Sequence, residues 1–358
     1  MKSKILTYCF AFYDEQKSLL KIDINGGNDP AARYAIMEQE VSTNKIEALQ
    51  RKIQEYWTFV DNKIKEGIVD IKDNERKRKI FFEDLKMFGG TIASLLLPKD
   101  VMTELWKHAA GSDIFCLATN MQWVPWESLY NPDTEQGEFL SDNCVISRIP
   151  TKTTMDTMQK CEEVSGRIIC LDPVLNQDYT HEAAQTASAI FESKGEDVYL
   201  TDLIGDFTKK VSNKQLISWI CEHEVDRGLR LCEDVHFTCD NCYTHRFPPG
   251  SVVFIMSCST ARADIKEEGY GARIVASSDC TVIAPSSIIA ARAGIDFASR
   301  LIELARKQAC SAVFELWTLL KRPLEGELAD DGNITPEKCY ALWFCIFGNC
   351  EASLESIQ

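Results

Sequence analysis

The chain has no long hydrophobic run. Although 45% of its 358 residues are apolar, no stretch approaches the roughly 20 consecutive apolar residues that a membrane-spanning helix needs. The apolar segment at the N-terminus is too short for a signal peptide, and Asp14 and Glu15 soon follow it. The sequence therefore predicts a cytoplasmic protein that does not enter a membrane.

The chain also has fewer basic than acidic residues. The chain carries 39 Lys and Arg residues against 54 Asp and Glu residues, which gives a net charge of −15. A field of that sign repels a phosphate backbone, so direct binding of nucleic acid is excluded as the main function. The one basic cluster, Arg76–Lys79, lies among acidic residues and is predicted to be a solvated helix face.

Histidine is scarce and cysteine is not: the chain has five histidines and fifteen cysteines. Without a secretion signal, so many cysteines indicate a reducing compartment rather than a disulfide framework. Most of them lie in apolar surroundings and are predicted to be small core residues. The few histidines matter because a cysteine nucleophile needs a nearby base, and there are few candidates for it.

The first 112 residues are predicted to form a hairpin and a helical pair. Residues 4–24 alternate as two strands around a turn at 14–16. From Ser42 to about 64, apolar residues recur every three or four positions, which predicts an amphipathic helix capped by Ser42 or Thr43. A second helix is expected at about 76–97, before Pro98. We assign residues 1–112 to an N-terminal subdomain packed against the rest.

The pattern changes in residues 113–358, where short apolar runs alternate with helical periods. Such alternation predicts an α/β fold, with a mostly parallel sheet and helices on both faces. Helices are expected at about 180–193, 205–216, 288–306 and 309–320. The apolar runs lie at 114–118, 144–147, 167–171, 198–200, 216–221, 252–257 and 281–284.

One of these runs ends in a cysteine that stands apart from the others. The apolar segment before Ser257 is followed at once by Cys258 and then by polar residues. A buried parallel strand of this kind delivers one thiol to the carboxyl edge of a sheet, where open α/β folds place their chemistry. Among the histidines, His223 closes the run 216–221 in the same way, so neighbouring strands are predicted to present both groups.

The residues around both positions resemble the CHAT peptidases, a family of caspase-like proteins often found beside tetratricopeptide repeats. Ile220–His223 with Asp226–Leu231 resembles the family's histidine block, and Val252–Cys258 resembles its cysteine block. Three further segments agree in order and spacing, so the resemblance spans nearly the whole chain. These segments are Trp123–Tyr130, Gly294–Leu304 and Tyr340–Gly348.

The resemblance implies a caspase-like fold and cleavage of peptide bonds without a cofactor. By position, Cys258 would be the nucleophile and His223 the general base and acid. The oxyanion would be held by the backbone N–H groups of Cys258 and of the residue after the histidine, Glu224. Family members act on a protein substrate, are often kept latent until a regulatory protein activates them, and work in prokaryotic defence or cell-death pathways.

Two positions qualify this interpretation. The family usually has glycine after the histidine, whereas Glu224 places a negative charge near a developing oxyanion. This departure supports a second hypothesis, an inactive caspase-like module that binds a partner or holds a complex together. Met256 occupies the position, two residues before the cysteine, that commonly lines the substrate pocket in caspase-like enzymes. Its apolar side chain favours substrates with an apolar or small residue just before the cleaved bond over those with a basic residue.

A third hypothesis is a zinc-stabilised interaction protein. His236, Cys239, Cys242 and His245 are four soft ligands at spacings compatible with zinc. However, a regular step of three residues is not the usual paired pattern, and close pairs arise readily by chance in a cysteine-rich chain. In the family the matching stretch is an ordinary connection between the two catalytic strands. The main expectation is therefore that this segment binds no metal.

Overall fold

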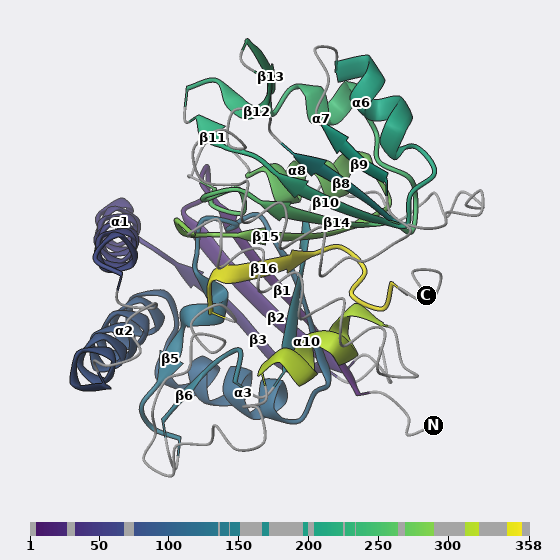
Figure 1. Ribbon diagram of the computed structural model, residues 1–358. Coiled ribbons are helices and arrows are strands. Elements are labelled where there is room, and N and C mark those ends of the chain that lie inside the picture. Colours follow the sequence, from purple (N-terminus) through teal and green to yellow (C-terminus); the bar gives the residue numbers. More distant parts are fainter. Residues whose placement is uncertain are drawn as a thin grey trace. The chain divides into compact units, whose positions relative to one another are not determined.

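The computed structural model divides the chain into two compact units (Figure 1). Unit 1 comprises Met1–Thr151 and Lys321–Trp343, and unit 2 comprises Lys152–Leu320 and Phe344–Gln358. The division at residues 112 and 113 stays a prediction. None of the described helices is long and apolar enough to cross a membrane. The structure describes residues 5–26, 33–67, 75–134, 137–142, 144–150, 167–171, 196–199, 204–224, 226–232, 234–263, 269–289, 312–321 and 342–352.

The strands of unit 1 begin with the predicted hairpin. β1 and β2 pair antiparallel, with Asp14 opposite Leu19 at the turn, and β3 pairs antiparallel with β2. β3 was not predicted. On its other side β1 pairs parallel with β4, and β4 pairs parallel with β7, so the hairpin extends this part of the sheet. The strands are β1 (Leu6–Asp14), β2 (Leu19–Gly26), β3 (Arg33–Glu40), β4 (Ile114–Thr119), β5 (Tyr130–Asn131), β6 (Glu138–Phe139) and β7 (Val145–Pro150).

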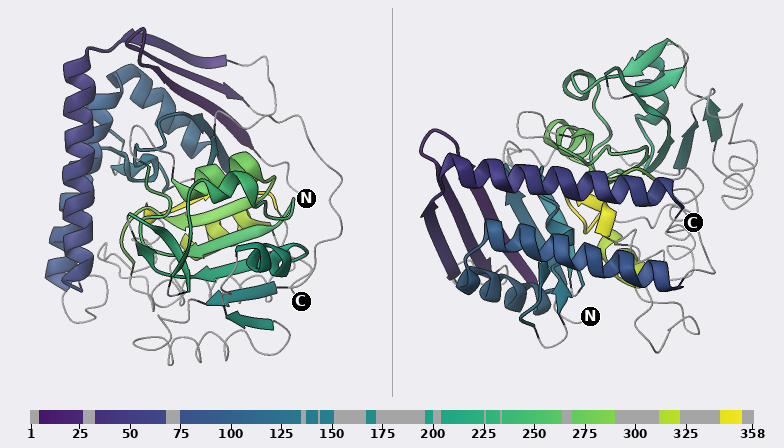
Figure 2. Two further views of the ribbon diagram at one scale, coloured as in Figure 1. Left: turned by 90° about the horizontal axis from the view of Figure 1, so that it is seen from above. Right: turned by 90° about the vertical axis from the view of Figure 1, so that its left-hand side faces the viewer.

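Among the described residues of unit 1 there are three α-helices, one more than predicted. The predicted periodicity is confirmed in α1 (Thr43–Lys65), whose buried residues recur every three or four positions. The Ser42 side chain caps this helix by accepting a hydrogen bond from the backbone of Lys45. α2 (Glu75–Leu96) lies beside α1 (Figure 2). The additional helix, α3 (Lys99–Ala110), begins directly after Pro98.

The Trp123–Tyr130 segment is held by a buried ion pair. Arg148 in β7 donates from its Nε atom to the Glu127 carboxylate at 2.9 Å, and a second guanidinium nitrogen contacts the other carboxylate oxygen. The remaining guanidinium hydrogens reach the carbonyls of Gln122 and Val124. A buried charge is tolerated only when it is paired and hydrogen-bonded in this way. The segment therefore has a packing role in unit 1.

Unit 2 contains the mostly parallel sheet that the sequence predicts. The strand order is β9-β8-β10-β14-β15-β16, and only β16 runs antiparallel to its neighbour. The two central strands, β10 and β14, are buried at every position. The strands are β8 (Arg167–Leu171), β9 (Glu196–Tyr199), β10 (Leu216–Ile220), β14 (Val252–Met256), β15 (Thr281–Pro285) and β16 (Phe344–Phe347).

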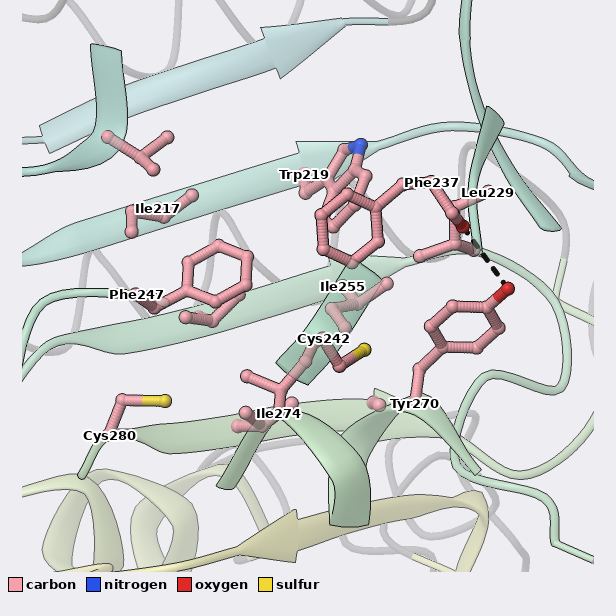
Figure 3. Close-up of a cluster of buried hydrophobic side chains, with 14 of the residues drawn as sticks. Ile217, Trp219, Leu229, Phe237, Cys242, Phe247, Ile255, Tyr270, Ile274 and Cys280 are labelled. Atoms are coloured by element: carbon pink, nitrogen blue, oxygen red, sulfur yellow. Dashed lines mark hydrogen bonds between the residues drawn. The ribbon is translucent and has the colours of Figure 1, made fainter. Parts of the chain in front are cut away.

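Helices cover both faces of this sheet, as predicted. On one face, α6 (Ile204–Val211), α7 (Asn241–Thr244) and α8 (Tyr270–Ser277) enclose a core with Trp219 at its centre (Figure 3). On the other face, Phe254 and Phe344 pack with ring centroids 5.6 Å apart. α10 (Val313–Lys321) covers them, with the ring of Trp317 6.5 Å from that of Phe344.

Two predicted helices cannot be compared with the structure. The one at 180–193 lies outside the described residues, and so does the one at 288–306 beyond its first two positions. The Gly294–Leu304 segment of the family resemblance falls in the same undescribed part.

Ile255 lies in the centre of the unit 2 core and is fully buried. We expect Ile255→Ala to lower the free energy of unfolding by about 2–5 kcal/mol, because it removes buried methyl groups and leaves a cavity. The matched control is Ile80→Ala in α2, where the side chain is 53% exposed. Thermal or urea unfolding should show a large loss for the first variant and little change for the second. Equal losses would contradict the assigned core.

Candidate active site

Cys258 and His223 come from neighbouring strands of unit 2. β10 and β14 pair parallel and in register, from Leu216 opposite Val252 to Ile220 opposite Met256. Cys258 lies two residues beyond the end of β14, and His223 lies three residues beyond the end of β10. The structure thus brings both residues to the carboxyl edge of the sheet, on adjacent strands, as the sequence predicts.

A hydrogen bond joins the two residues. The Nδ1 atom of His223 lies 2.9 Å from the backbone carbonyl oxygen of Cys258. Because a carbonyl only accepts hydrogen bonds, Nδ1 carries the proton, and Nε2 of the neutral ring is left as the acceptor. The imidazole is thereby fixed in one tautomer against the residue that bears the thiol.

The surroundings of His223 favour the neutral ring. Burial lowers the pKa of His223 from its ordinary value of 6.5, and the positive charge of Arg262 lowers it further, against the opposing effect of the Cys258 carbonyl. The Tyr270 ring meets the imidazole edge to face, with centroids 5.5 Å apart. A neutral imidazole near pH 7 can accept a proton, which is what a general base requires.

The loop after β14 is attached to the end of β15. The backbone N–H of Ser259 donates to Ser287 at 3.0 Å, and that of Ala261 donates to Pro285 at 2.8 Å. Arg262 Nε donates to the Ser286 carbonyl at 2.9 Å. Ser259 itself has φ of 58°, a left-handed conformation that is uncommon outside glycine. These contacts hold the backbone around Cys258 in a sharp turn, which we call the nucleophile loop (residues 257–263).

The Cys258 thiol is half-buried and donates to a main-chain carbonyl. Its Sγ atom lies 3.5 Å from the oxygen of Ile289, just beyond β15. In this arrangement the thiol keeps its proton.

Glu224 is turned toward basic residues of a small separate sheet. This sheet consists of β11 (His223–Glu224), β12 (Gly228–Cys232) and β13 (Val235–Phe237). The carboxylate of Glu224 lies 3.2 Å from His236 Nε2, 3.5 Å from Arg230 and 3.7 Å from Arg227. The close approach of His236 is the main reason why the pKa of Glu224 is lowered.

The two histidines among the four zinc-ligand candidates contact other residues. His236 contacts Glu224, and His245 Nδ1 lies 3.0 Å from the hydroxyl of Thr208. Cys242 is fully buried in the hydrophobic core, and Cys239 packs at the edge of that core. Within the described ranges, no three His, Cys, Asp or Glu side chains are grouped as metal ligands. The geometry does not support a zinc site here.

Met256 ends β14 opposite Ile220 and is only 5% exposed. It directly precedes the nucleophile loop, and its role in a substrate pocket stays a prediction. However, nearly all of its surface is already covered by the protein. It could contribute only the floor of a substrate pocket.

Two residues that border the site were not predicted from the sequence. Arg262 follows Cys258 by four positions, but nothing in the sequence shows that its charge acts on His223. Tyr270 lies 47 positions after the histidine it contacts. The nearest signal is the Gly269-Tyr270-Gly271 pattern, because paired glycines often mark a close backbone approach.

No protein-family model matches the sequence, and no curated protein matches it either. Solved structures do. Two crystal structures of the separase–securin complex of Saccharomyces cerevisiae align over 96% of this chain, with TM-scores of 0.53 and 0.52 and sequence identities of 9% and 12%.

The chain has the fold of these structures. It is a caspase-like α/β fold. The matched region is 30% of the yeast chain. A structure of the complex of the pro- and mature domains of RgpB from Porphyromonas gingivalis also aligns with the chain. The alignment covers 77% of this chain and 78% of the RgpB chain, with 11% identity and a TM-score of 0.44.

The left-handed conformation of Ser259 leads to a testable expectation about stability. Ser259→Val should lower the free energy of unfolding by about 1–2 kcal/mol, since a β-branched residue is strained at positive φ. Ser259→Asn serves as the matched control, because asparagine tolerates this conformation. Comparison of the two unfolding midpoints tests the turn. Equal unfolding midpoints for the valine and asparagine variants would rule out a left-handed conformation at Ser259.

Proposed function

We propose that the chain is a CHAT-type cysteine endopeptidase that cuts a protein partner through a dyad of Cys258 and His223. The observation that carries this proposal is the 2.9 Å hydrogen bond from His223 Nδ1 to the Cys258 carbonyl. It supports the dyad because it places the proton of the neutral ring on Nδ1, so that Nε2 is the proton acceptor, at the strand edge where the thiol also lies. The caspase-like fold supports the same class of reaction.

The proposed reaction is acyl transfer. His223 Nε2 takes the proton of the Cys258 thiol, and the thiolate adds to the scissile carbonyl carbon. The tetrahedral intermediate collapses when His223 gives that proton to the leaving amine, which leaves a thioester on Cys258. His223 then deprotonates a water molecule that attacks the thioester. This step releases the carboxylic acid and restores the thiol.

The oxyanion of each tetrahedral intermediate needs hydrogen-bond donors. We assign this role to the backbone N–H groups of Cys258 and Glu224. Removing one such donor typically costs about 10²–10³ in rate. The nucleophile loop supports this assignment because its backbone is held by hydrogen bonds to Ser287 and Pro285, which limits reorganisation during the reaction.

We further propose that the enzyme is latent until a regulatory protein activates it, in a prokaryotic defence or cell-death pathway, as the resemblance to CHAT peptidases implies. The bond from the Cys258 thiol to the Ile289 carbonyl supports a resting state in which the thiol stays protonated. The yeast separase structures contain separase with a protein partner, securin. Buried Met256 leads us to expect an apolar or small residue before the cut.

Thiol labelling tests the dyad. With an iodoacetamide probe near pH 7 and a candidate activating partner present, we expect Cys258 to be the fastest-labelled cysteine of the wild-type protein, measured by mass spectrometry of its peptide. His223→Ala should slow labelling of Cys258 about tenfold, because an unactivated thiol is only a few per cent thiolate at this pH.

Two control variants match this experiment. Cys116→Ala removes another half-buried cysteine, in β4, and should leave labelling of Cys258 unchanged. His108→Gln alters a histidine of α3 that pairs with Glu104 and should also have no effect. If Cys258 labels no faster than the other cysteines in the presence of candidate partners, the inactive binding module becomes the better hypothesis.

Glu224 gives the second test between an enzyme and an inactive module. If its charge blocked the oxyanion site, Glu224→Gly would raise the labelling and cleavage rates by orders of magnitude. Because basic residues already surround the carboxylate, we expect a change within about fivefold, the scale of an exposed ion pair. Glu222→Gly is the matched control, since Glu222 pairs with Arg230 on the same hairpin.

A further inference from the structure

Tyr270 is the aromatic neighbour of the proposed base. Its ring meets the His223 imidazole edge to face, with centroids 5.5 Å apart and planes at 86°. The side chain is only 6% exposed, although it opens a short helix, α8, beside a site that substrate must reach. Edge-to-face contacts of this kind fix the relative orientation of two rings.

The hydroxyl of Tyr270 is attached to the sheet that contains His223. It donates to the carbonyl oxygen of Phe237 in β13 at 3.2 Å (Figure 3). Gly228, at the start of β12, has φ of +117°, and a Cβ atom there would lie 2.9 Å from the hydroxyl oxygen. The small sheet therefore leaves space for the Tyr270 hydroxyl. Burial raises the pKa of Tyr270, so the hydroxyl stays protonated and remains a donor.

The backbone of Tyr270 is attached to the nucleophile loop. At the preceding residue, Gly269, a Cβ atom would lie 2.7 Å from the carbonyl oxygen of Arg262, so only glycine allows this approach. The N–H of the following residue, Gly271, donates to Thr260 at 3.4 Å. Tyr270 therefore links the loop that bears Cys258 to the small sheet that bears His223.

We propose that Tyr270 is a positioning residue that holds the His223 imidazole in place and shields it from water. The proposal rests on the proposed peptidase function, because it assigns Tyr270 to the orientation of that reaction's base. The ring covers one side of the imidazole, and its two attachments keep the imidazole aligned with the Cys258 carbonyl. The role is indirect, since nothing in the proposed reaction requires Tyr270 to touch substrate.

Other charged groups near His223 are accounted for by their own contacts. On its own segment, Glu222 pairs with Arg230, and Glu224 pairs with His236. From the nucleophile loop, Arg262 and the Cys258 carbonyl face the imidazole. A change at Tyr270 leaves all of these residues in the chain. A shift in the titration of His223 in a Tyr270 variant would therefore report the loss of the aromatic cover.

The test compares Tyr270→Phe, which keeps the ring, with Tyr270→Leu, which removes it. NMR of protein with labelled histidines follows the His223 titration, and His223→Gln assigns its resonance. In wild type and in Tyr270→Phe, the His223 imidazole should have a titration midpoint below 6.5, the ordinary value for histidine. In Tyr270→Leu, the midpoint of His223 should lie closer to that value. Each unit of upward shift should slow Cys258 alkylation by iodoacetamide about tenfold at pH values below both midpoints.

Tyr243→Leu in α7 is the matched control, because Tyr243 is 52% exposed. Tyr270→Met replaces Tyr270→Leu if the leucine variant does not fold. The proposal is overturned if a folded variant without the ring keeps the wild-type midpoint and alkylation profile. It is also overturned if Tyr270→Phe changes both as much as the leucine variant does. A shifted midpoint with no selective labelling of wild-type Cys258 would support the positioning role and reject the peptidase.

Discussion

The candidate site depends on one pairing, that of β10 with β14. Because these strands run parallel and in register, with Leu216 opposite Val252, the residues that follow them leave the sheet at the same edge. A shift by one residue would move every side chain of a strand to the opposite face of the sheet. Both strands are buried along their whole length, and their apolar side chains fill both faces of the sheet. The proximity of Cys258 and His223 is thus a consequence of core packing.

The contacts around this edge act on the backbone more than on the side chains. His223 bonds to the carbonyl of Cys258, while the nucleophile loop bonds to carbonyls at and beyond the end of β15. Such bonds resist small changes in side-chain composition. At Glu224 the side chain turns away to other partners, because its carboxylate lies near His236 and two arginines.

Several parts of this arrangement could be predicted from the sequence. Apolar runs of three to six residues, separated by helical periods, indicated the parallel sheet. The polar residues that end two of those runs indicated Cys258 and His223. The cap at Ser42 and the stop before Pro98 followed from local backbone chemistry. β3 and α3 were missed because local pattern alone did not distinguish them from the connections between elements. In the His236–His245 segment, spacing alone could not show that His236 meets Glu224 and that His245 meets Thr208.

The sequence by itself determined which residues end the buried strands, because hydrophobic burial acts on each strand through its own residues. Only the tertiary structure decided what those residues meet. The partners of Glu224, the tautomer of His223 and the contact of Tyr270 with the imidazole all join positions from different elements. Such contacts depend on how strands and loops pack in space, and no local pattern in the chain records them.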